Sequence, residues 1–247
     1  MSKHTTPSTG DLAQHVVDAS LTTADPHSPL TARYASLVGS LIYAATQTRP
    51  DIAYAVGMLS RVLAKPTPAL MEDAERVLTY LYHHRAVGLR YSATPSDPDA
   101  FSDASWEAAH STSGWLIRWQ NAAVYFASKK QKSVALSSAE AELMALSEAA
   151  KDCVHFQAFS DEVCPPALRP MPLATDNQAA RDLAYNPEHH ERTKHIARRH
   201  FYVRELVEDH VLRVPFVRSH DNLADFFTKH LAPKHFFALR KIIMNIP

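Results

Sequence analysis

The stretch SKKQKSVALSSAEAELMAL, residues 128–146, joins a predicted strand to a long predicted helix. Within it, Ser137 and Glu140 form the S-x-x-E pattern, in which two side chains cap the first turn of a helix. Apolar residues recur with helical spacing beyond this point, as far as Phe156. We therefore expect one helix from Ser137 to about Val163.

The same spacing selects one acid of this helix. Glu142 begins a stripe that continues at offsets of 4, 7, 11 and 14 residues, through Leu146, Ala149, Cys153 and Phe156. Glu140 points roughly to the opposite side. A helix packs its apolar stripe against the rest of the domain, so we expect Glu142, and not Glu140 or Glu148, to face the sheet.

The residues before this helix show the two-residue period of strands. Residues 100–106 alternate, and the alternation places Asp103 on the same side as an aromatic residue that should be buried. Residues 114–119 and 122–128 are expected to form an antiparallel hairpin with a two-residue turn. A carboxylate on the buried side of the first strand needs a compensating partner.

The residues after the long helix continue an alternation of strands and helices. The order along the chain is typical of an α/β domain with a mixed sheet flanked by helices. The expected elements are a strand at 171–175, helices at 177–185 and 195–208, a strand at 211–217 and a final helix at 221–230, capped by Asp221.

The first part of the chain differs in composition. Residues 1–30 are rich in Ser, Thr and Pro and are expected to be a disordered leader or linker. Helical apolar stripes then follow one another to about Arg85, and a turn-rich break lies near residues 94–98. We therefore expect a helical segment at 31–96 and an α/β domain at 97–247.

Composition sets outer limits on function. The chain has 26 basic and 26 acidic residues, so a nucleic-acid partner would have to be held by local basic patches. No apolar run is long enough to cross a membrane, and the first residues lack a secretory signal. An intracellular protein without a membrane partner is expected. Of its two cysteines, Cys153 is interpreted as a core residue and Cys164 as a free thiol.

Two more acids occupy positions from which they can face inward. Asp176 directly follows a predicted strand, where α/β sheets usually build sites, although a helix N-cap is an equally good interpretation. Asp225 falls in the first turn of the last helix and would by itself be taken for a solvated acid. Converging carboxylates repel one another unless a cation compensates them, and oxygen ligands favour Mg²⁺ or Mn²⁺.

The chain resembles the ribonuclease H region of copia-type retrotransposon polyproteins. The resemblance rests on motifs that follow one another in the family's order: FSDASW at 101–106, STSGW at 111–115, the opening stretch at 128–146, DNQAA at 176–180, RTKHI at 192–196 and DNLADFFTK at 221–229. The segments YASLVGSLIY at 34–43 and TRPDIAYAV at 48–56 resemble the stretch that precedes the nuclease in that family.

The resemblance implies a ribonuclease H fold with a five-stranded mixed sheet. It also implies that Asp103, Glu142, Asp176 and Asp225 bind two Mg²⁺ ions, with Mn²⁺ as a possible substitute, and that the chain hydrolyses the RNA strand of RNA·DNA hybrids. His220 lies where related nucleases often carry a mobile histidine that assists proton transfer or product release. A surface residue without a role is the alternative for His220.

Basic residues are expected to contact the hybrid through its phosphates, without reading its sequence. The alternatives for the basic run at 188–200 are a solvated helix face and, with lower weight, a zinc site at His190, His195 and His200. The predicted nucleic-acid contacts are Lys129, Lys130, Lys132, Asn177, Arg192, Lys194, His195, Arg198 and Arg199.

Two departures from the family pattern limit the expected function. The loop between Trp106 and His110 is short, and no polymerase Y-x-D-D motif is present in the sequence. The leading interpretation is a nuclease module whose partner is the polymerase part of a reverse transcriptase. The alternatives are a non-catalytic remnant that binds nucleic acid or a protein, and a transposase-like nuclease of the same broad fold, which the acid on the long helix argues against.

Overall fold

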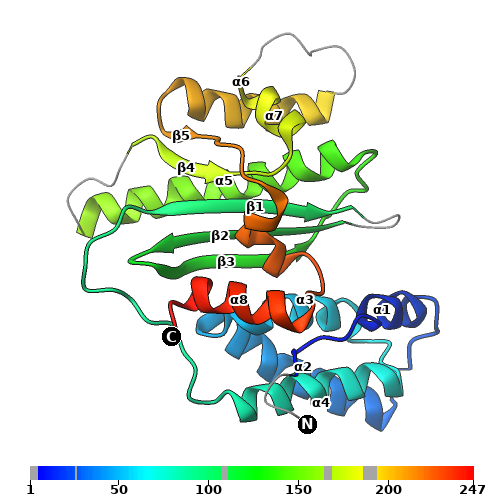
Figure 1. The fold of residues 1–247 in the computed structure, drawn as a ribbon. Helices are drawn as coiled ribbons and strands as arrows, with labels where there is room; N and C mark the ends of the chain where they lie inside the picture. Colours follow the sequence, from blue (N-terminus) through cyan, green and yellow to red (C-terminus); the bar gives the residue numbers. More distant parts are fainter. Residues whose placement is uncertain (1–4, 26, 107–110, 164–168, 186–193) are drawn as a thin grey trace. The chain divides into compact units, whose positions relative to one another are not determined.

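A computed structural model describes residues 5–25, 27–106, 111–163, 169–185 and 194–247, and for residues 194–200 only the course of the backbone. The chain divides into two units. One contains Met1–Arg90 together with Lys229–Pro247, and the other contains Tyr91–Thr228. Figure 1 shows the elements of both units.

The second unit is built on a five-stranded mixed sheet, as predicted. The strand order is β3-β2-β1-β4-β5. The pairs β1–β2 and β2–β3 are antiparallel, and β1–β4 and β4–β5 are parallel (Figure 1). The strands are β1 (Asp99–Ser105), β2 (Thr112–Trp119), β3 (Ala122–Lys130), β4 (Met171–Ala174) and β5 (Leu212–Arg213).

The predicted hairpin is confirmed. Gln120 and Asn121 form its turn with φ angles of 53° and 66°. Two consecutive positive φ angles match the right-handed twist of the strands that such a turn joins. The last predicted strand, at 211–217, is shorter than expected, because pairing beyond β5 is limited to a bridge between Thr175 and Phe216.

Helix α5 (Ser138–Val163) confirms the predicted long helix and its start. The Ser137 hydroxyl accepts the Glu140 N–H at 3.1 Å, and the Glu140 carboxylate accepts the Leu136 N–H at 2.7 Å. Glu140 is therefore buried in the cap and is not exposed on the far side of the helix. The apolar stripe of α5 packs into the main core with residues of the sheet and of α6 and α7.

The two faces of β2 carry different elements. The Trp115 indole N–H donates to Asp152 of α5 at 2.6 Å, whereas the neighbouring Gly114 lies against the segment 224–228. Because consecutive strand residues point to opposite faces, α5 covers one face and this segment covers the other. Helices α6 (Gln178–Tyr185) and α7 (Lys194–Glu208) complete the unit with α5.

The predicted final α-helix at 221–230 requires correction. The segment forms two short 3-10 helices, η3 (Ser219–Asp221) and η4 (Leu223–Phe227). Its cap is Asn222, whose side-chain oxygen accepts the Ala224 N–H at 3.1 Å, and not Asp221. Asn222 also donates to the carbonyl oxygen of Ser102 at 3.0 Å. This tie to β1 explains why the buried amide, and not the exposed acid before it, fixes the turn.

The first unit is helical, as predicted, but it begins earlier. Helix α1 (Leu12–Ser20) lies inside the predicted disordered leader. Leu12, Val16 and Ala19 recur at helical spacing and are buried. The burial of this short stripe offsets the conformational entropy that the chain loses when the helix forms. The other helices are α2 (Pro29–Gln47), η1 (Pro50–Ile52), α3 (Ala53–Leu59), η2 (Ser60–Val62) and α4 (Pro68–His83).

The end of the chain also belongs to this unit. Helix α8 (Pro233–Met244), which the sequence analysis did not predict, buries Phe236 and Ile243. Its Arg240 donates to the Tyr80 hydroxyl of α4 at 2.9 Å. The predicted α/β domain at 97–247 is corrected accordingly: the sheet unit is Tyr91–Thr228.

Candidate metal centre

Three acids from distant parts of the chain meet in the second unit. Asp103, Glu142 and Asp176 each present a carboxylate oxygen, and these oxygens all lie within 4.8 Å of one another. Asp103 comes from β1, Glu142 from the first turns of α5, and Asp176 from the end of β4. All three acids were predicted from the sequence.

Asp103 is a buried member of this cluster. Its carboxylate accepts a hydrogen bond from the Thr228 hydroxyl, directly after η4. Thr228 is itself buried and belongs to the same unit. The strand therefore supplies the acid, and the segment after η4 supplies a donor that orients one of its oxygens.

The close packing of this segment depends on Gly114, which pairs with Asp103 across β1 and β2. A Cβ atom on Gly114 would lie 2.6 Å from the Thr228 Cγ2 and 2.8 Å from the Phe227 Cβ. Such distances are well below van der Waals contact, so a side chain at this position would push the segment away from the sheet.

Asp176 follows β4 and occupies a half-buried position. The N-cap of α6 is the neighbouring Asn177 and not Asp176, because the Asn177 side chain accepts the Ala180 N–H at 2.9 Å. The Asn177 N–H is in turn held by the Thr175 hydroxyl at 3.3 Å. Asp176 is thereby left to join the other acids. Asn177, a predicted nucleic-acid contact, has its side-chain oxygen occupied in this cap.

Asp225, the fourth predicted acid, lies in η4 and is buried. The expectation from its local sequence, a solvated acid, is therefore wrong. Its carboxylate is not part of the set whose oxygens all lie within 4.8 Å. The Thr228 hydroxyl, which contacts Asp103, also lies 3.4 Å from the carbonyl oxygen of Asp225. Asp225 is thus on the same short turn as a residue that touches the cluster.

His220 lies outside the cluster. Its side chain is exposed, and its Nε2 lies 3.2 Å from the carboxylate of the adjacent Asp221. The structure gives it no contact with Asp103, Glu142 or Asp176 among the interactions of the described residues.

Apart from Asn177, the predicted nucleic-acid contacts lie near the end of β3 or between residues 192 and 199. Lys129 and Lys130 end β3, and Lys132 follows it. Arg192 lies outside the described residues. The other four lie in α7, where only the backbone is described: Lys194, His195, Arg198 and Arg199. Of the histidines in the zinc alternative, His190 lies outside the described residues, and His195 and His200 lie in α7.

The tryptophans separate into buried and exposed residues. Trp115 is a core residue, and Trp119 packs against the same core. Trp106 is 57% exposed, and its indole N–H donates to the carbonyl oxygen of Ala135 at 3.2 Å. Cys153 is buried in the core as predicted, and burial raises the pKa of its thiol. Cys164 lies outside the described residues.

The donor set of the cluster suits a hard cation. Each of the three residues offers oxygen, and two of them are buried. Neighbouring carboxylates in a buried site disfavour one another's ionised forms unless a positive charge is present. Oxygen-only ligands favour Mg²⁺ or Mn²⁺ over metals that prefer nitrogen or sulfur. The residues therefore fit a divalent cation site.

Three supporting residues were missed in the sequence: Gly114, Asn222 and Thr228. Their motifs, STSGW and DNLADFFTK, were noted, but only for the resemblance and the acid. A glycine inside a strand pattern is a signal for a close backbone approach, and it was available here. The role of Asn222 had no such signal, because Asp221 beside it is an equally good cap by sequence.

In the part of the chain that the structure describes, none of the helices has the length and apolar character needed to cross a membrane. No family model matches the chain. The chain is 35% identical over 219 residues to a retrovirus-related Pol polyprotein from the transposon TNT 1-94 of Nicotiana tabacum, a match that covers 86% of this chain and 16% of the polyprotein. The chain thus spans a small part of that relative.

A second relative is short. The chain is 43% identical over 126 residues to the secreted RxLR effector protein 161 of Plasmopara viticola, which covers 49% of this chain and 89% of the effector. Among solved structures, a foamy viral protease-reverse transcriptase in complex with RNA/DNA hybrid covers 85% of this chain and 27% of the viral chain, with a TM-score of 0.52 and 12% identity. LC11-RNase H1 in complex with RNA/DNA hybrid covers 53% of this chain and 93% of its own, with a TM-score of 0.42 and 13% identity.

Proposed function

Because the chain belongs to the retrovirus-related Pol polyproteins of copia-type transposons, we propose that its Tyr91–Thr228 unit is a ribonuclease H. The unit has the ribonuclease H-like fold. The observation that carries the proposal is the meeting of Asp103, Glu142 and Asp176. In this proposal the unit hydrolyses the RNA strand of an RNA·DNA hybrid.

Two Mg²⁺ ions, or Mn²⁺, are the proposed cofactors, held by the oxygens of Asp103, Glu142 and Asp176 with Asp225 as a fourth ligand. Such ions activate a water molecule and stabilise the leaving oxygen in phosphodiester hydrolysis. The chain's own residues position the acids: Thr228 orients the Asp103 carboxylate, and Asn222 ties the turn that carries Asp225 to β1. His220 is proposed to assist proton transfer or product release from its exposed position in η3.

The proposed substrate is held by phosphate contacts, through lysines at the end of β3 and basic residues of α7, so cleavage should depend little on sequence. Discrimination of RNA from DNA would rest on the 2′-hydroxyl. The proposed partner is the polymerase part of a reverse transcriptase, next to which the first, helical unit would lie in the chain. The proposed location is intracellular.

The test is cleavage of an end-labelled RNA·DNA hybrid with and without Mg²⁺. We expect wild-type protein to cut the RNA strand only with the metal, and Asp103→Asn and Glu142→Gln to lose at least 100-fold in rate, a loss on the order of that for one essential catalytic group. Glu162→Gln, which changes an exposed acid near the far end of the same helix, should retain activity. Cleavage by Asp103→Asn at the wild-type rate would contradict the proposal.

A second candidate is a non-catalytic protein that uses the same fold for binding. It is favoured by the short effector relative, 89% of whose length matches this chain. In that case wild-type protein and Asp103→Asn would be equally inactive, while binding of a hybrid or of a protein partner would persist. The cleavage assay therefore separates the two candidates.

A further inference from the structure

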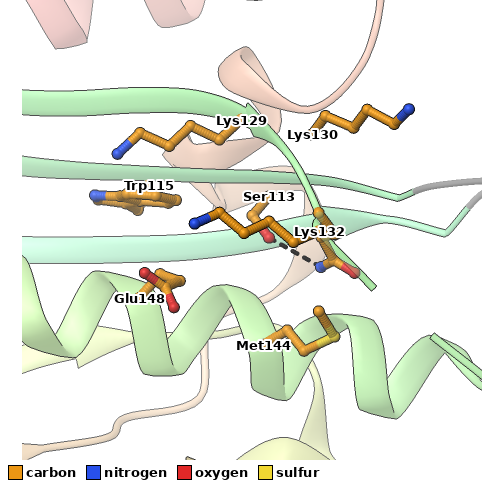
Figure 2. Close-up of a pocket in the computed structure, with 8 residues that line it drawn as sticks. Ser113, Trp115, Lys129, Lys130, Lys132, Met144 and Glu148 are labelled. Atoms are coloured by element: carbon orange, nitrogen blue, oxygen red, sulfur yellow. Dashed lines mark hydrogen bonds between the residues drawn. The ribbon is translucent and has the colours of Figure 1, made fainter. Parts of the chain in front are cut away.

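A lysine-lined pocket lies between the end of β3 and helix α5, in the Tyr91–Thr228 unit. Its lining includes Trp115, Lys129, Lys130, Gln131, Lys132 and Glu148. Figure 2 shows the side chains of Lys129 and Lys132 directed toward Trp115, whereas Lys130 points away. Two ammonium groups thus approach one aromatic side chain from neighbouring positions of the chain.

Among the described residues no carboxylate forms an ion pair with Lys129 or Lys132, although Asp152 interacts electrostatically with Lys129. The nearby acid of the pocket, Glu148, is already paired with Lys151, at 2.8 Å. The protein therefore compensates the positive charge of the pocket only in part. A bound anion would gain charge-assisted hydrogen bonds from both ammonium groups.

The floor of the pocket is rigid. Trp115 is buried, and its indole N–H donates to Asp152 at 2.6 Å. The Lys129 Nζ lies 4.9 Å from the centre of the indole ring, within the range of a cation–π interaction. This contact holds the Lys129 ammonium group in place before any ligand arrives.

Gln131 connects the pocket to the candidate metal centre. Its buried amide donates to the Ser113 hydroxyl and to the carbonyl oxygen of Ala141, both at 2.9 Å. Ala141 directly precedes Glu142 on α5. The residue between the pocket lysines is thus bonded to the helical turn that presents one of the clustered acids, so the spacing between pocket and acids is fixed by the fold.

We propose that Lys129 and Lys132 bind one backbone phosphate of a nucleic-acid strand over Trp115, and that this phosphate sets the register of the strand on the acids. The inference rests on the proposed function for the identity of the ligand. A nucleic-acid backbone is favoured over an acidic peptide because its phosphates recur at a fixed spacing along a strand. One phosphate in the pocket therefore fixes which phosphodiester bond reaches the acids.

The first test is the salt dependence of hybrid binding, measured by fluorescence anisotropy on the full chain without divalent metal. Each phosphate contact contributes about 0.9 to the slope of log K against log salt concentration. Because both lysines contact one phosphate, we expect the double variant Lys129→Gln/Lys132→Gln to reduce the slope by about this amount in total, and Lys129→Arg, which keeps the charge, to retain it. Lys241→Gln, on α8, is the charge-matched control and should leave the slope unchanged.

The second test locates the phosphate. Hybrids with one neutral methylphosphonate linkage are compared position by position, for wild-type protein and Lys132→Gln. At one position we expect the wild-type protein to lose about tenfold in affinity and the variant to lose nothing further, because the contact is already absent. Losses that are the same for both proteins at every position would overturn the proposal.

The two proposals fail separately. If wild-type protein does not cleave the hybrid in Mg²⁺ but shows the position-specific coupling, the pocket stands and the nuclease proposal fails. If the wild-type protein cleaves the hybrid but shows no position-specific coupling, the nuclease proposal stands and the pocket proposal fails. Competition by inorganic phosphate as effective as competition by the hybrid would also overturn the proposal, since it would indicate a site for a free anion.

Discussion

At the residue scale, Gly114 determines how closely the turn with Asp225 and Thr228 approaches β1 and β2. The position leaves no room for a Cβ atom, since Thr228 Cγ2 would lie 2.6 Å from it. We predict that Gly114→Ala lowers the free energy of unfolding by about 1–3 kcal/mol, the usual cost of overpacking. The same change should weaken Mn²⁺ binding, because it displaces Asp225 and Thr228 from Asp103.

The matched control is Gly39→Ala in helix α2, where a Cβ would meet nothing within 4 Å. There the change should stabilise the protein by about 0.5–1 kcal/mol, because alanine favours a helix. Denaturant unfolding and metal titration of both variants check the pair. Equal effects of the two substitutions would contradict the role assigned to Gly114.

A second residue-scale prediction concerns Asp152. Burial raises the pKa of its carboxyl above the ordinary value of 3.8, although the Trp115 indole that donates to it acts in the opposite direction. Between 3.8 and the raised pKa the folded protein holds a proton that the unfolded chain has lost. The contribution of Asp152 to the free energy of unfolding therefore falls as pH rises through this window.

Asp152→Asn should remove this contribution, and its amide oxygen can still accept the indole hydrogen bond. We predict that the variant gains stability relative to wild type as pH rises from about 4 to about 7. Urea unfolding of both proteins at several pH values measures the difference in their unfolding free energies. The contributions of the other acids cancel in this difference. A difference that does not change with pH would refute the assignment.

At the scale of elements, local signals predicted some parts of the structure and missed others. The start of α5 and the hairpin turn at Gln120 were predictable, because capping and turn chemistry act over a few residues. Helix α1 was missed because flanking Ser, Thr and Pro outweighed a short apolar stripe. The 3-10 geometry of η4 was also missed, since it depends on contacts of Asn222 with β1, which are distant in sequence.

The acids show the same division. The side of the helix on which Glu142 lies was predictable from the helical period. The position of Asp176 was predictable because it directly follows a strand. The burial of Asp225 was not predictable from its own neighbours, because it results from packing against the sheet.

Helix α1 supplies the element-scale prediction. Leu12 is buried, whereas Val17 on the same helix is 48% exposed. We predict that Leu12→Ala costs about 2–5 kcal/mol of unfolding free energy and exposes residues 12–20 to limited proteolysis. Val17→Ala should change stability by less than about 0.5 kcal/mol. If the two variants behave alike, the helix does not contribute to the folded unit.

At the scale of the whole molecule, the helical unit contains a buried polar network of its own residues. In the helical unit, Arg49 donates two hydrogen bonds to Asp51, which also accepts the Tyr80 hydroxyl at 2.6 Å. Arg240 of α8 then donates to Tyr80. The network joins the end of the chain to helices near its beginning, and all four residues are buried.

We predict that Asp51→Asn destabilises the helical unit by about 3–5 kcal/mol, because it leaves a buried arginine without its counter-charge. Hydrogen exchange should accelerate in α3, α4 and α8, with the amides of β1 and β2 unchanged. Glu75→Gln breaks the exposed pair with Arg33 and is the control, with an expected effect below about 1 kcal/mol. Equal acceleration in both units would contradict an effect confined to the helical unit.

Anomalous diffraction from crystals grown with Mn²⁺ would show whether acids from β1, α5 and the end of β4 form one metal site. We expect Mn²⁺ density contacted by the carboxylates of Asp103, Glu142 and Asp176, and its loss in Asp103→Asn. Mn²⁺ bound only elsewhere on the protein, with these three side chains uncoordinated, would rule out the site.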